Sequence, residues 1–219
     1  MLRSRITDRF IEQGNVDRFE CKRCFDVVVG GLLFLCLLPL MLLIGLALRI
    51  EGGGAVLFAQ DRIGKNLRKF RIFKFRTLYA NSGSGSASEG LSRDDPRLTT
   101  VGRLLREMGL DELPQLLNVL GGTMSLVGPR PLIAEEAVAC VDVCPERYSV
   151  RPGITGLAQV NGRNALPLPE RLREDSEYVV HRTIALDIII LIRTLAVPFS
   201  PRNAYARSST SRETTGVDR

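Results

Sequence analysis

A block of 22 consecutive uncharged residues, 27–48, constrains the fold of this 219-residue chain more than any other feature. Asp26 precedes the block and Arg49 follows it. An apolar stretch of this length is sufficient for a membrane-spanning helix. A secretory signal peptide fits less well, because the block starts late, exceeds the usual apolar core and lacks a small-residue cleavage site after it. The block therefore predicts an N-terminal membrane helix.

Two features of this segment argue against a simple span. Pro39 lies in its middle, where it removes one backbone hydrogen bond and kinks a helix. Basic residues also flank the block on both sides, and residues 51–80 hold seven Lys or Arg against two acids. The positive-inside rule places both flanks on the cytoplasmic side. A helix that enters the membrane, breaks at Pro39 and returns satisfies this rule, while a kinked single span is the alternative.

The overall charge is modestly basic, with 30 Lys and Arg against 24 Asp and Glu. This surplus permits anionic partners such as phosphates and lipid headgroups but excludes a histone-like mode of binding. The basic segments lack interleaved stacking aromatics, so nucleic-acid binding is not expected. Five cysteines are too few for a disulfide-stapled domain. The Cys21–Cys24 and Cys140–Cys144 pairs could in principle form a zinc site, but apolar packing of reduced thiols is favoured.

The remaining pattern indicates an α+β fold in which the membrane helix joins a small cytoplasmic domain with a short β element. Strands are expected at 55–61 and 70–77, and helices at 100–108, 112–120, 132–141, 170–181 and 184–197. The last of these is apolar but interrupted by charge, which favours an interfacial or core helix over a span. The expected segments are a polar 1–21, a membrane helix 22–50, a catalytic domain 51–198 and a disordered tail 199–219.

The sharpest local feature is the carboxylate pair Asp111–Glu112. Pro114 is tolerated in a first helical turn, so a helix is expected to begin near Asp111 and to place the pair at its positive end. Such a site can hold a nucleophilic carboxylate beside a metal-bridged diphosphate. The alternative is ordinary helix capping, for which Asp and Glu are common.

Basic residues near this pair are candidates for phosphate contact. Arg106 precedes the pair, and Arg130 lies between two prolines that would hold it rigidly. Lys74 and Arg76 alternate along an expected strand and so face one side. A solvated strand face or lipid headgroup contact is the alternative for these last two residues.

Together these motifs resemble the bacterial sugar transferase family, the monotopic phosphoglycosyl transferases. The resemblance runs from about residue 22 to residue 194 and is specific because the motifs occur in the family order and spacing. The matching stretches are 22–26 (KRCFD), 58–64 (FAQDRIG), 74–77 (KFRT), 110–120 (LDELPQLLNVL), 124–131 (MSLVGPRP) and 152–160 (PGITGLAQV).

The resemblance implies transfer of sugar-1-phosphate from a UDP-sugar to polyprenyl phosphate, with release of UMP, to initiate exopolysaccharide or surface-glycan synthesis. It implies that Asp111 is the nucleophile that forms a covalent phosphosugar intermediate, and that Glu112 assists the second half-reaction. It also implies Mg²⁺ near Asp111, a helix break at Pro39, a location in the bacterial inner membrane with a cytoplasmic catalytic domain, and contact with lipid. A homodimer is compatible with this reading.

The family pattern assigns further site residues. Arg106, Arg130, Lys74 and Arg76 are expected to bind the substrate phosphates. The expected substrate pocket contains Pro129, Gln159 and Arg163.

Three positions depart from the family pattern. Thr123 replaces a usual Asp, Leu38 replaces a hydroxyl residue before Pro39, and Gly109 replaces Ser or Thr. The large N-terminal membrane domain of longer relatives is also absent from this sequence, which suggests a compact catalytic core. A catalytically weakened, membrane-anchored scaffold that binds anionic lipid or glycan-assembly partners, motivated by Thr123, is therefore the competing hypothesis.

Overall fold

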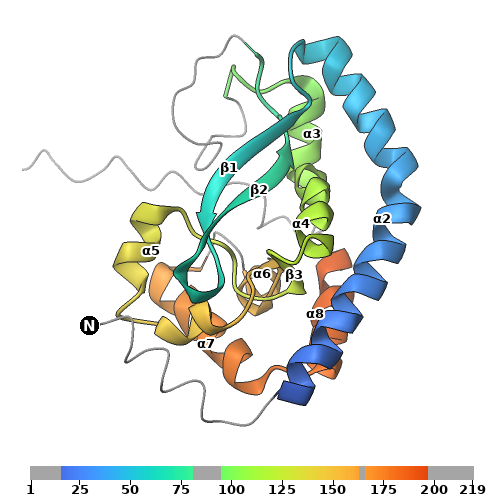
Figure 1. The fold of residues 1–219 in the computed structure, drawn as a ribbon. Helices are drawn as coiled ribbons and strands as arrows, with labels where there is room; N and C mark the ends of the chain where they lie inside the picture. The colour runs from blue at the N-terminus through green and yellow to red at the C-terminus, as the bar shows by residue number, and fades with distance from the viewer. Residues whose placement is uncertain (1–15, 81–94, 163–165, 197–219) are drawn as a thin grey trace, which may run out of the picture.

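The computed structural model describes residues 16–80, 95–162 and 166–196. This part of the chain mixes helices with two small two-stranded sheets, as the sequence predicts (Figure 1). The α-helices are α2 (Val16–Gly52), α3 (Thr100–Met108), α4 (Leu116–Leu120), α5 (Ala134–Cys140), α6 (Leu157–Asn161), α7 (Leu168–His181) and α8 (Ile184–Ala196). The strands are β1 (Leu57–Ile63), β2 (Lys69–Phe75), β3 (Ser125–Val127) and β4 (Gly153–Thr155). The 3-10 turns are η1 (Lys65–Leu67), η2 (Leu110–Gln115) and η3 (Pro145–Ser149).

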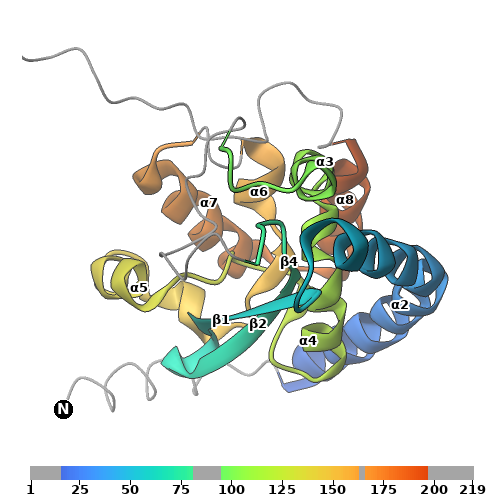
Figure 2. The ribbon, with the colours of Figure 1, turned by 90° about the horizontal axis from the view of Figure 1, so that it is seen from above.

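Helix α2 lies along one flank of the molecule, and α5 and α7 lie on the opposite flank (Figures 1 and 2). It is 37 residues long and stays helical through Pro39. Its course is bent rather than straight (Figure 1). A single proline removes one hydrogen bond and leaves the other helical bonds in place, so a bend is its expected minimum effect. An interruption that turns the chain back at Pro39 is not seen, and re-entry into a membrane stays a prediction.

Both ends of α2 are fixed to the same body of the protein. Near its start, Lys22 forms an ion pair of 2.8 Å with Asp187 of α8. Near its end, Leu48 is buried in the cluster that contains Phe75 of β2. The Glu51 carboxylate accepts hydrogen bonds from the backbone of the first turn of α3, including a 2.9 Å bond from Val101 N. The two polar ends of the apolar helix therefore meet one domain.

The stretch of α2 between these ends presents apolar side chains to the outside. Leu32, Leu35, Leu42 and Leu43 are each about two-thirds exposed. Within the described residues, one helical segment, Cys21–Gly52, is long and apolar enough to cross a membrane. Exposed aliphatic side chains on α8 extend this surface, namely Ile188, Ile189, Ile192 and Leu195. An apolar surface of this extent needs a partner other than water.

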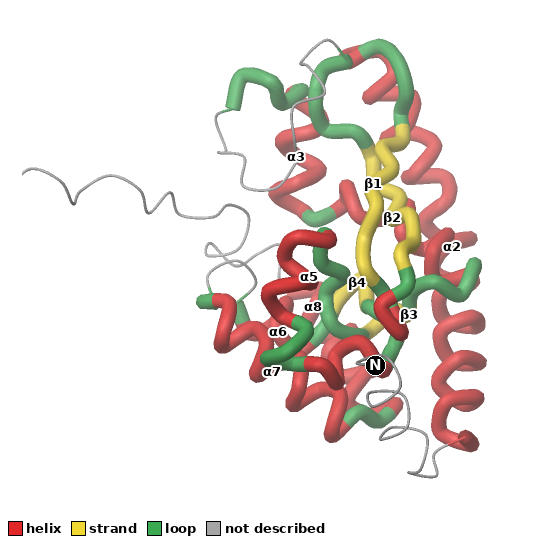
Figure 3. The backbone as a smooth tube through the Cα atoms, turned by 60° about the vertical axis from the view of Figure 1, so that its left-hand side comes forward, coloured by secondary structure: helices red, strands yellow, loops and turns green. Residues whose placement is uncertain are grey.

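The antiparallel hairpin of β1 and β2 lies between α2 and the C-terminal helices (Figure 3). Asn118 of α4 joins this hairpin to the core: its amide donates to Arg71 O, and its carbonyl accepts from Phe73 N. The main core gathers around Val119, Met124 and Ile190, which are fully buried. The hairpin therefore has a fixed position relative to α4, which follows the candidate carboxylates directly.

Strands β3 and β4 pair in parallel at a very close backbone approach. A Cβ atom added to Gly153 would lie 2.1 Å from Gly128 N, and one added to Gly156 would lie 2.3 Å from Gly128 O. Only glycine fits at these positions. This contact fixes the start of the Gly-Pro-Arg-Pro turn that carries Arg130.

Most of the expected elements are confirmed within about two residues. The helix expected at 100–108 is α3, and the expected strands correspond to β1 and β2. No strand is predicted from the sequence at residues 125–127, but these residues form β3. Three residues are too few for a recognisable alternation, and β3 depends on its pairing with β4. The predicted segment boundaries stay predictions. Residues 1–15, 81–94 and 197–219, and with them the predicted polar N-terminal segment and C-terminal tail, lie wholly or mostly outside the described residues.

Candidate active site

A tight reversal of the backbone brings Arg106 close to Asp111. Helix α3 ends at Gly109, which has φ 69° in the left-handed region, and the Gly109 N–H donates to the carbonyls of Arg106 and Leu105. Glycine adopts this conformation without steric cost, which explains why Gly109 ends the helix. Turn η2 begins at the next residue and carries Asp111 and Glu112 in its first turn, as predicted.

Glu112 is buried and held between two cations. Its Oε1 lies 3.0 Å from Lys74 Nζ and 3.0 Å from an Arg130 guanidinium nitrogen. Burial alone would raise the pKa of Glu112, but the charges of Arg130 and Lys74 and their hydrogen bonds outweigh it and hold the pKa well below its usual range. Glu112 therefore stays ionised and fixes both cations in place.

Asp111 is half-buried and has the opposite electrostatic character. Burial raises its pKa above the usual range, and the negative charge of Glu112 raises it further. The positive charges of Lys74, Arg106 and Arg130 oppose this rise. Two adjacent carboxyl groups whose pKa values move apart are typical of a site in which each has a different chemical task. A more basic carboxylate is also the stronger nucleophile once it is ionised.

The structure separates the predicted phosphate-binding residues into two groups. Lys74 and Arg130 contact Glu112, and Arg106 lies near enough to lower the pKa of Asp111. Arg76 lies elsewhere: its guanidinium donates to the Gly53 carbonyl in the turn after α2. Strand β2 ends at Phe75, so Arg76 follows the chain away from the strand face that Lys74 occupies. The assignment of Arg76 to a phosphate site together with Lys74 stays a prediction.

Two of the three predicted pocket residues, Pro129 and Gln159, lie in the described part of the chain. Pro129 lines a small cavity together with Arg130 and Arg147. Gln159 is buried in α6, and neither polar atom of its side chain has a hydrogen-bond partner among the described residues. Arg163 lies outside the described residues. The pocket assignment for these residues stays a prediction.

A buried ion pair supports the turn that carries Arg130 and was missed at the level of sequence. Arg147 lies 2.9 Å from an Asp175 carboxylate oxygen, and both side chains are almost fully buried. Arg147 also donates a 2.8 Å hydrogen bond to the backbone carbonyl of Arg130. The pair joins η3 to α7. The two residues are far apart in the sequence, so no local sequence pattern could indicate that they pair.

Thr123, which replaces a usual Asp of the family pattern, serves the turn between α4 and β3. Its hydroxyl donates a 3.2 Å hydrogen bond to the backbone carbonyl oxygen of Asn118 and accepts a 3.2 Å hydrogen bond from the side-chain amide of the same residue. These contacts hold Asn118, which joins the hairpin to α4. Thr123 is not among the groups that shift the pKa of Asp111 or Glu112.

The residues at the site fit a magnesium ion that is held mainly by substrate and water. Among the described residues there is no group of three or more His, Cys, Asp or Glu side chains suited to hold a metal. Glu112 is already engaged by two cations, which leaves Asp111 as the available carboxylate. Mg²⁺ commonly uses one or two carboxylates together with substrate phosphates, so this donor set is adequate when a diphosphate is present.

The structure thus combines an apolar helix long enough to cross a membrane with a carboxylate pair among three cations. The sequence model of the family described as "Bacterial sugar transferase" matches residues 17–201. The chain belongs to the bacterial sugar transferase family.

Three relatives illustrate this membership. The chain is 43% identical over 195 residues to the "Undecaprenyl-phosphate glucose phosphotransferase" of Komagataeibacter xylinus, covering 84% of this chain and 37% of that protein. It is 37% identical over 199 residues to the "Exopolysaccharide production protein ExoY" of Sinorhizobium fredii, covering 84% and 88%. It is 41% identical over 192 residues to the "UDP-glucose:undecaprenyl-phosphate glucose-1-phosphate transferase" of Caulobacter vibrioides, covering 84% and 72%. The chain thus spans little more than a third of the first relative and most of the second.

Proposed function

We propose that this protein transfers sugar-1-phosphate from a UDP-sugar to polyprenyl phosphate, with release of UMP, as the initiating step of exopolysaccharide or surface-glycan synthesis. The observation that carries this proposal is the Asp111–Glu112 pair, with Lys74 and Arg130 on Glu112 and Arg106 near Asp111. The names of two of these relatives, a glucose phosphotransferase and a glucose-1-phosphate transferase, support the same class of reaction.

In the first half-reaction, an Asp111 carboxylate oxygen attacks the phosphorus that bears the sugar. The new bond joins this oxygen to phosphorus, and the bond to the bridging oxygen of the diphosphate breaks, so that UMP leaves with the electron pair. Arg106, Arg130 and Lys74 supply positive charge near the site where negative charge develops. The raised pKa of Asp111 supports the nucleophile role because it indicates a basic carboxylate.

In the second half-reaction, a phosphate oxygen of polyprenyl phosphate attacks the same phosphorus and releases the Asp111 carboxylate. The product is a polyprenyl diphosphosugar. The lowered pKa of Glu112 makes it a weak base, so its assistance is to keep Lys74 and Arg130 in position for the acceptor phosphate. Asp111 and the substrate diphosphate would hold Mg²⁺, which supplies neutralising charge on the phosphate oxygens.

The proposed location is the cytoplasmic face of the bacterial inner membrane, with α2 inserted from that face. The attachment of both ends of α2 to one domain supports insertion and return on a single side. The exposed apolar surface on α2 and α8 supports lipid contact and an interfacial position for α8. A polyprenyl phosphate in the bilayer and a UDP-sugar in the cytosol can both reach a site at that boundary.

The experiment that tests the reaction is intact-mass measurement of the purified chain incubated with Mg²⁺ and a UDP-sugar but without acceptor. We expect a mass increase of one sugar phosphate, which disappears when polyprenyl phosphate is added. The increase should be absent in Asp111→Asn and retained in Asp61→Asn, since Asp61 is exposed on β1. An adduct in Asp111→Asn would contradict the nucleophile assignment. UDP-glucose and UDP-galactose should be compared in parallel to identify the sugar.

The competing proposal is a membrane-anchored scaffold with weakened catalysis, which the replacement of Asp by Thr123 favours. Acceptor-dependent UMP release at ordinary enzymatic rates from the purified chain would exclude it. A chain that binds UDP-sugar but forms no adduct and releases no UMP would support it instead.

A further inference from the structure

A second cavity, of about 410 Å³, lies at the start of α2 and does not involve the carboxylate pair. It is enclosed by the first turns of α2 and α8, by β3, by the end of α7 and by the η1 turn. Asp111, Glu112, Lys74 and Arg130 do not line it. Its volume falls in the range of small-molecule sites. Its charged lining residues are Lys22, Asp26, Lys65, Arg151, Arg182 and Asp187.

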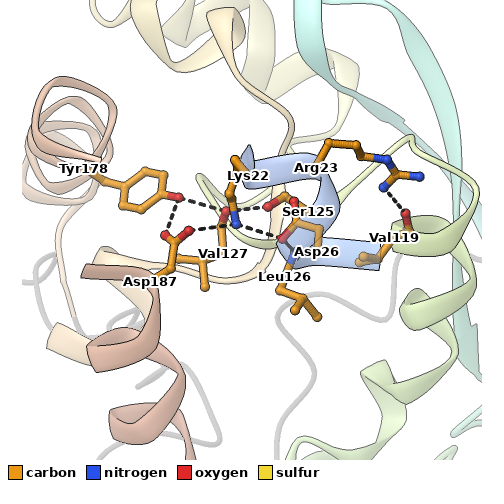
Figure 4. A network of polar contacts seen from close by, with 9 residues as sticks. All are labelled: Lys22, Arg23, Asp26, Val119, Ser125, Leu126, Val127, Tyr178 and Asp187. Carbon is orange, nitrogen blue, oxygen red and sulfur yellow. Dashed lines mark hydrogen bonds and ion pairs between the residues drawn. The ribbon is translucent and has the colours of Figure 1, made fainter. Parts of the chain in front are cut away.

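The two acidic groups on the wall are already satisfied by protein contacts. Lys22 Nζ lies 2.7 Å from Asp26 and 2.8 Å from Asp187, between the two carboxylates (Figure 4). Asp26 also accepts a hydrogen bond from Leu126 N, and the Tyr178 hydroxyl lies 2.8 Å from Asp187. Lys22 thereby contacts both acids, and the remaining basic groups that line the cavity are Lys65, Arg151 and Arg182.

Lys65, Arg151 and Arg182 come from three separate segments, and the positive charges of Arg151 and Arg182 act on Lys65. Burial lowers the pKa of Lys65, and the positive charges of Arg151 and Arg182 lower it further. Burial and the charge of Arg23 likewise lower the pKa of Arg151. Part of each guanidinium is used structurally, because Arg151 donates to Gly122 O and Arg182 donates to Val179 O. An anion in the cavity would relieve the repulsion among these groups.

Part of the lining is apolar. Val127 and Val150 lie on the wall, together with Val180 and Ile184. The cavity also lies at the boundary between polar and apolar sequence on two helices. Immediately after Asp26, α2 exposes Val28, and immediately after Asp187, α8 exposes Ile188. This boundary is where the headgroups of a bilayer meet its hydrocarbon.

We propose that the cavity binds the phosphate headgroup of an anionic membrane lipid, with Lys65, Arg151 and Arg182 around the phosphate and the acyl chains along Val180 and Ile184. The bound lipid would join the start of α2, η1 and the α7–α8 turn. The site rests on the membrane association proposed above but is separate from the proposed reaction.

The test is thermal unfolding of the full chain, delipidated in the uncharged detergent dodecyl maltoside and titrated with dihexanoylphosphatidylglycerol. Binding to the folded state raises the unfolding temperature. We expect saturable stabilisation of the wild type and about fivefold weaker binding in Lys65→Gln, the effect of one basic residue near an anionic surface. Lys69→Gln makes the same charge change on an exposed side chain of β2 and should bind like the wild type. Arg182→Gln provides an independent variant if Lys65→Gln unfolds without lipid.

Two comparison ligands distinguish the sources of phosphate. Dihexanoylphosphatidylcholine and inorganic phosphate should each stabilise the wild type much less than phosphatidylglycerol does. Equal stabilisation by phosphatidylcholine or by phosphate would overturn the assignment to an anionic lipid. Equal responses in Lys65→Gln, Arg182→Gln and the wild type would overturn the location. Because UMP release is not measured, failure of the lipid site and failure of the proposed reaction are distinguishable.

Discussion

Lys22 of α2 forms a 2.8 Å ion pair with Asp187 of α8, so residues from opposite ends of the chain meet in the interior. The same ammonium lies 2.7 Å from Asp26, and both carboxylates are about 1% exposed. One cation therefore compensates two buried acids. This arrangement attaches the start of the apolar helix to the C-terminal part of the domain.

Lys22→Gln should destabilise the fold by about 3–5 kcal/mol, because it leaves buried carboxylates without their cation. Denaturant titration in detergent would measure the change in the free energy of unfolding. Lys69→Gln, on an exposed ion pair, should change the stability by no more than about 1 kcal/mol. Equal stabilities of the two variants would show that Lys22 does not carry this role.

Lys74→Gln should lower kcat for UMP release by about 10²-fold or more, since it removes a fixed positive charge from the site. The free-energy effect arises in the transition state, so the loss should appear in kcat rather than in KM alone. Arg71→Gln is the matched control, because Arg71 lies on the same strand but its side chain is exposed and pairs with Asp61. Similar kcat values for both variants would exclude a role for Lys74 in the reaction.

The pH dependence of turnover should report the raised pKa of Asp111. The nucleophile must be ionised, so activity should fall as the pH falls through a pKa above the ordinary value of 3.8. Arg106 lowers this pKa, and Arg106→Gln should therefore move the acid limb of kcat/KM to higher pH. Arg103→Gln removes a charge from the same helix and is the control, because the leading charges on Asp111 are those of Glu112, Lys74, Arg106 and Arg130. An acid limb that stays in place in Arg106→Gln would contradict the proximity of Arg106 to Asp111.

Asp175 should make stability depend on pH in a mildly acidic window. Burial raises the pKa of Asp175 to about 6, against an ordinary value of 3.8, despite its ion pair with Arg147. The folded protein binds this proton more tightly than the unfolded chain. The contribution is therefore fully present below about pH 3.8 and is lost as the pH rises through about 6, by up to about 3 kcal/mol. As the pH rises across this window, the unfolding temperature should fall less steeply for Asp175→Asn than for the wild type. Parallel curves of unfolding temperature against pH for the two proteins would contradict the prediction.

Thr123→Ala should cost about 1 kcal/mol of stability through the lost contact with Asn118 and should change kcat by less than about threefold. Unfolding and UMP release measured on one preparation would separate the two effects. A loss of turnover without a loss of stability would instead assign Thr123 to the reaction.

The parts of the fold that follow from local pattern were predictable, and those that depend on tertiary pairing were not. The period of α3, the alternation in β2 and the apolar block of α2 all appear in the sequence. The pairing of β3 with β4 and the Arg147–Asp175 ion pair join segments that have no local signal for each other. The site shows the same division. Asp111 and Glu112 were predicted from their motif, but the separation of Lys74 from Arg76 follows from the end of β2.

The contact between Glu51 and the first turn of α3 links the C-terminal end of α2 to the candidate active site. The same short α3 ends at Gly109, two residues before the proposed nucleophile. A displacement of the C-terminal end of α2 must either break the bonds to Glu51 or carry α3 and its Arg106 along. With α2 inserted in a membrane as proposed, a change in bilayer thickness would act through this contact on the position of Arg106 near Asp111.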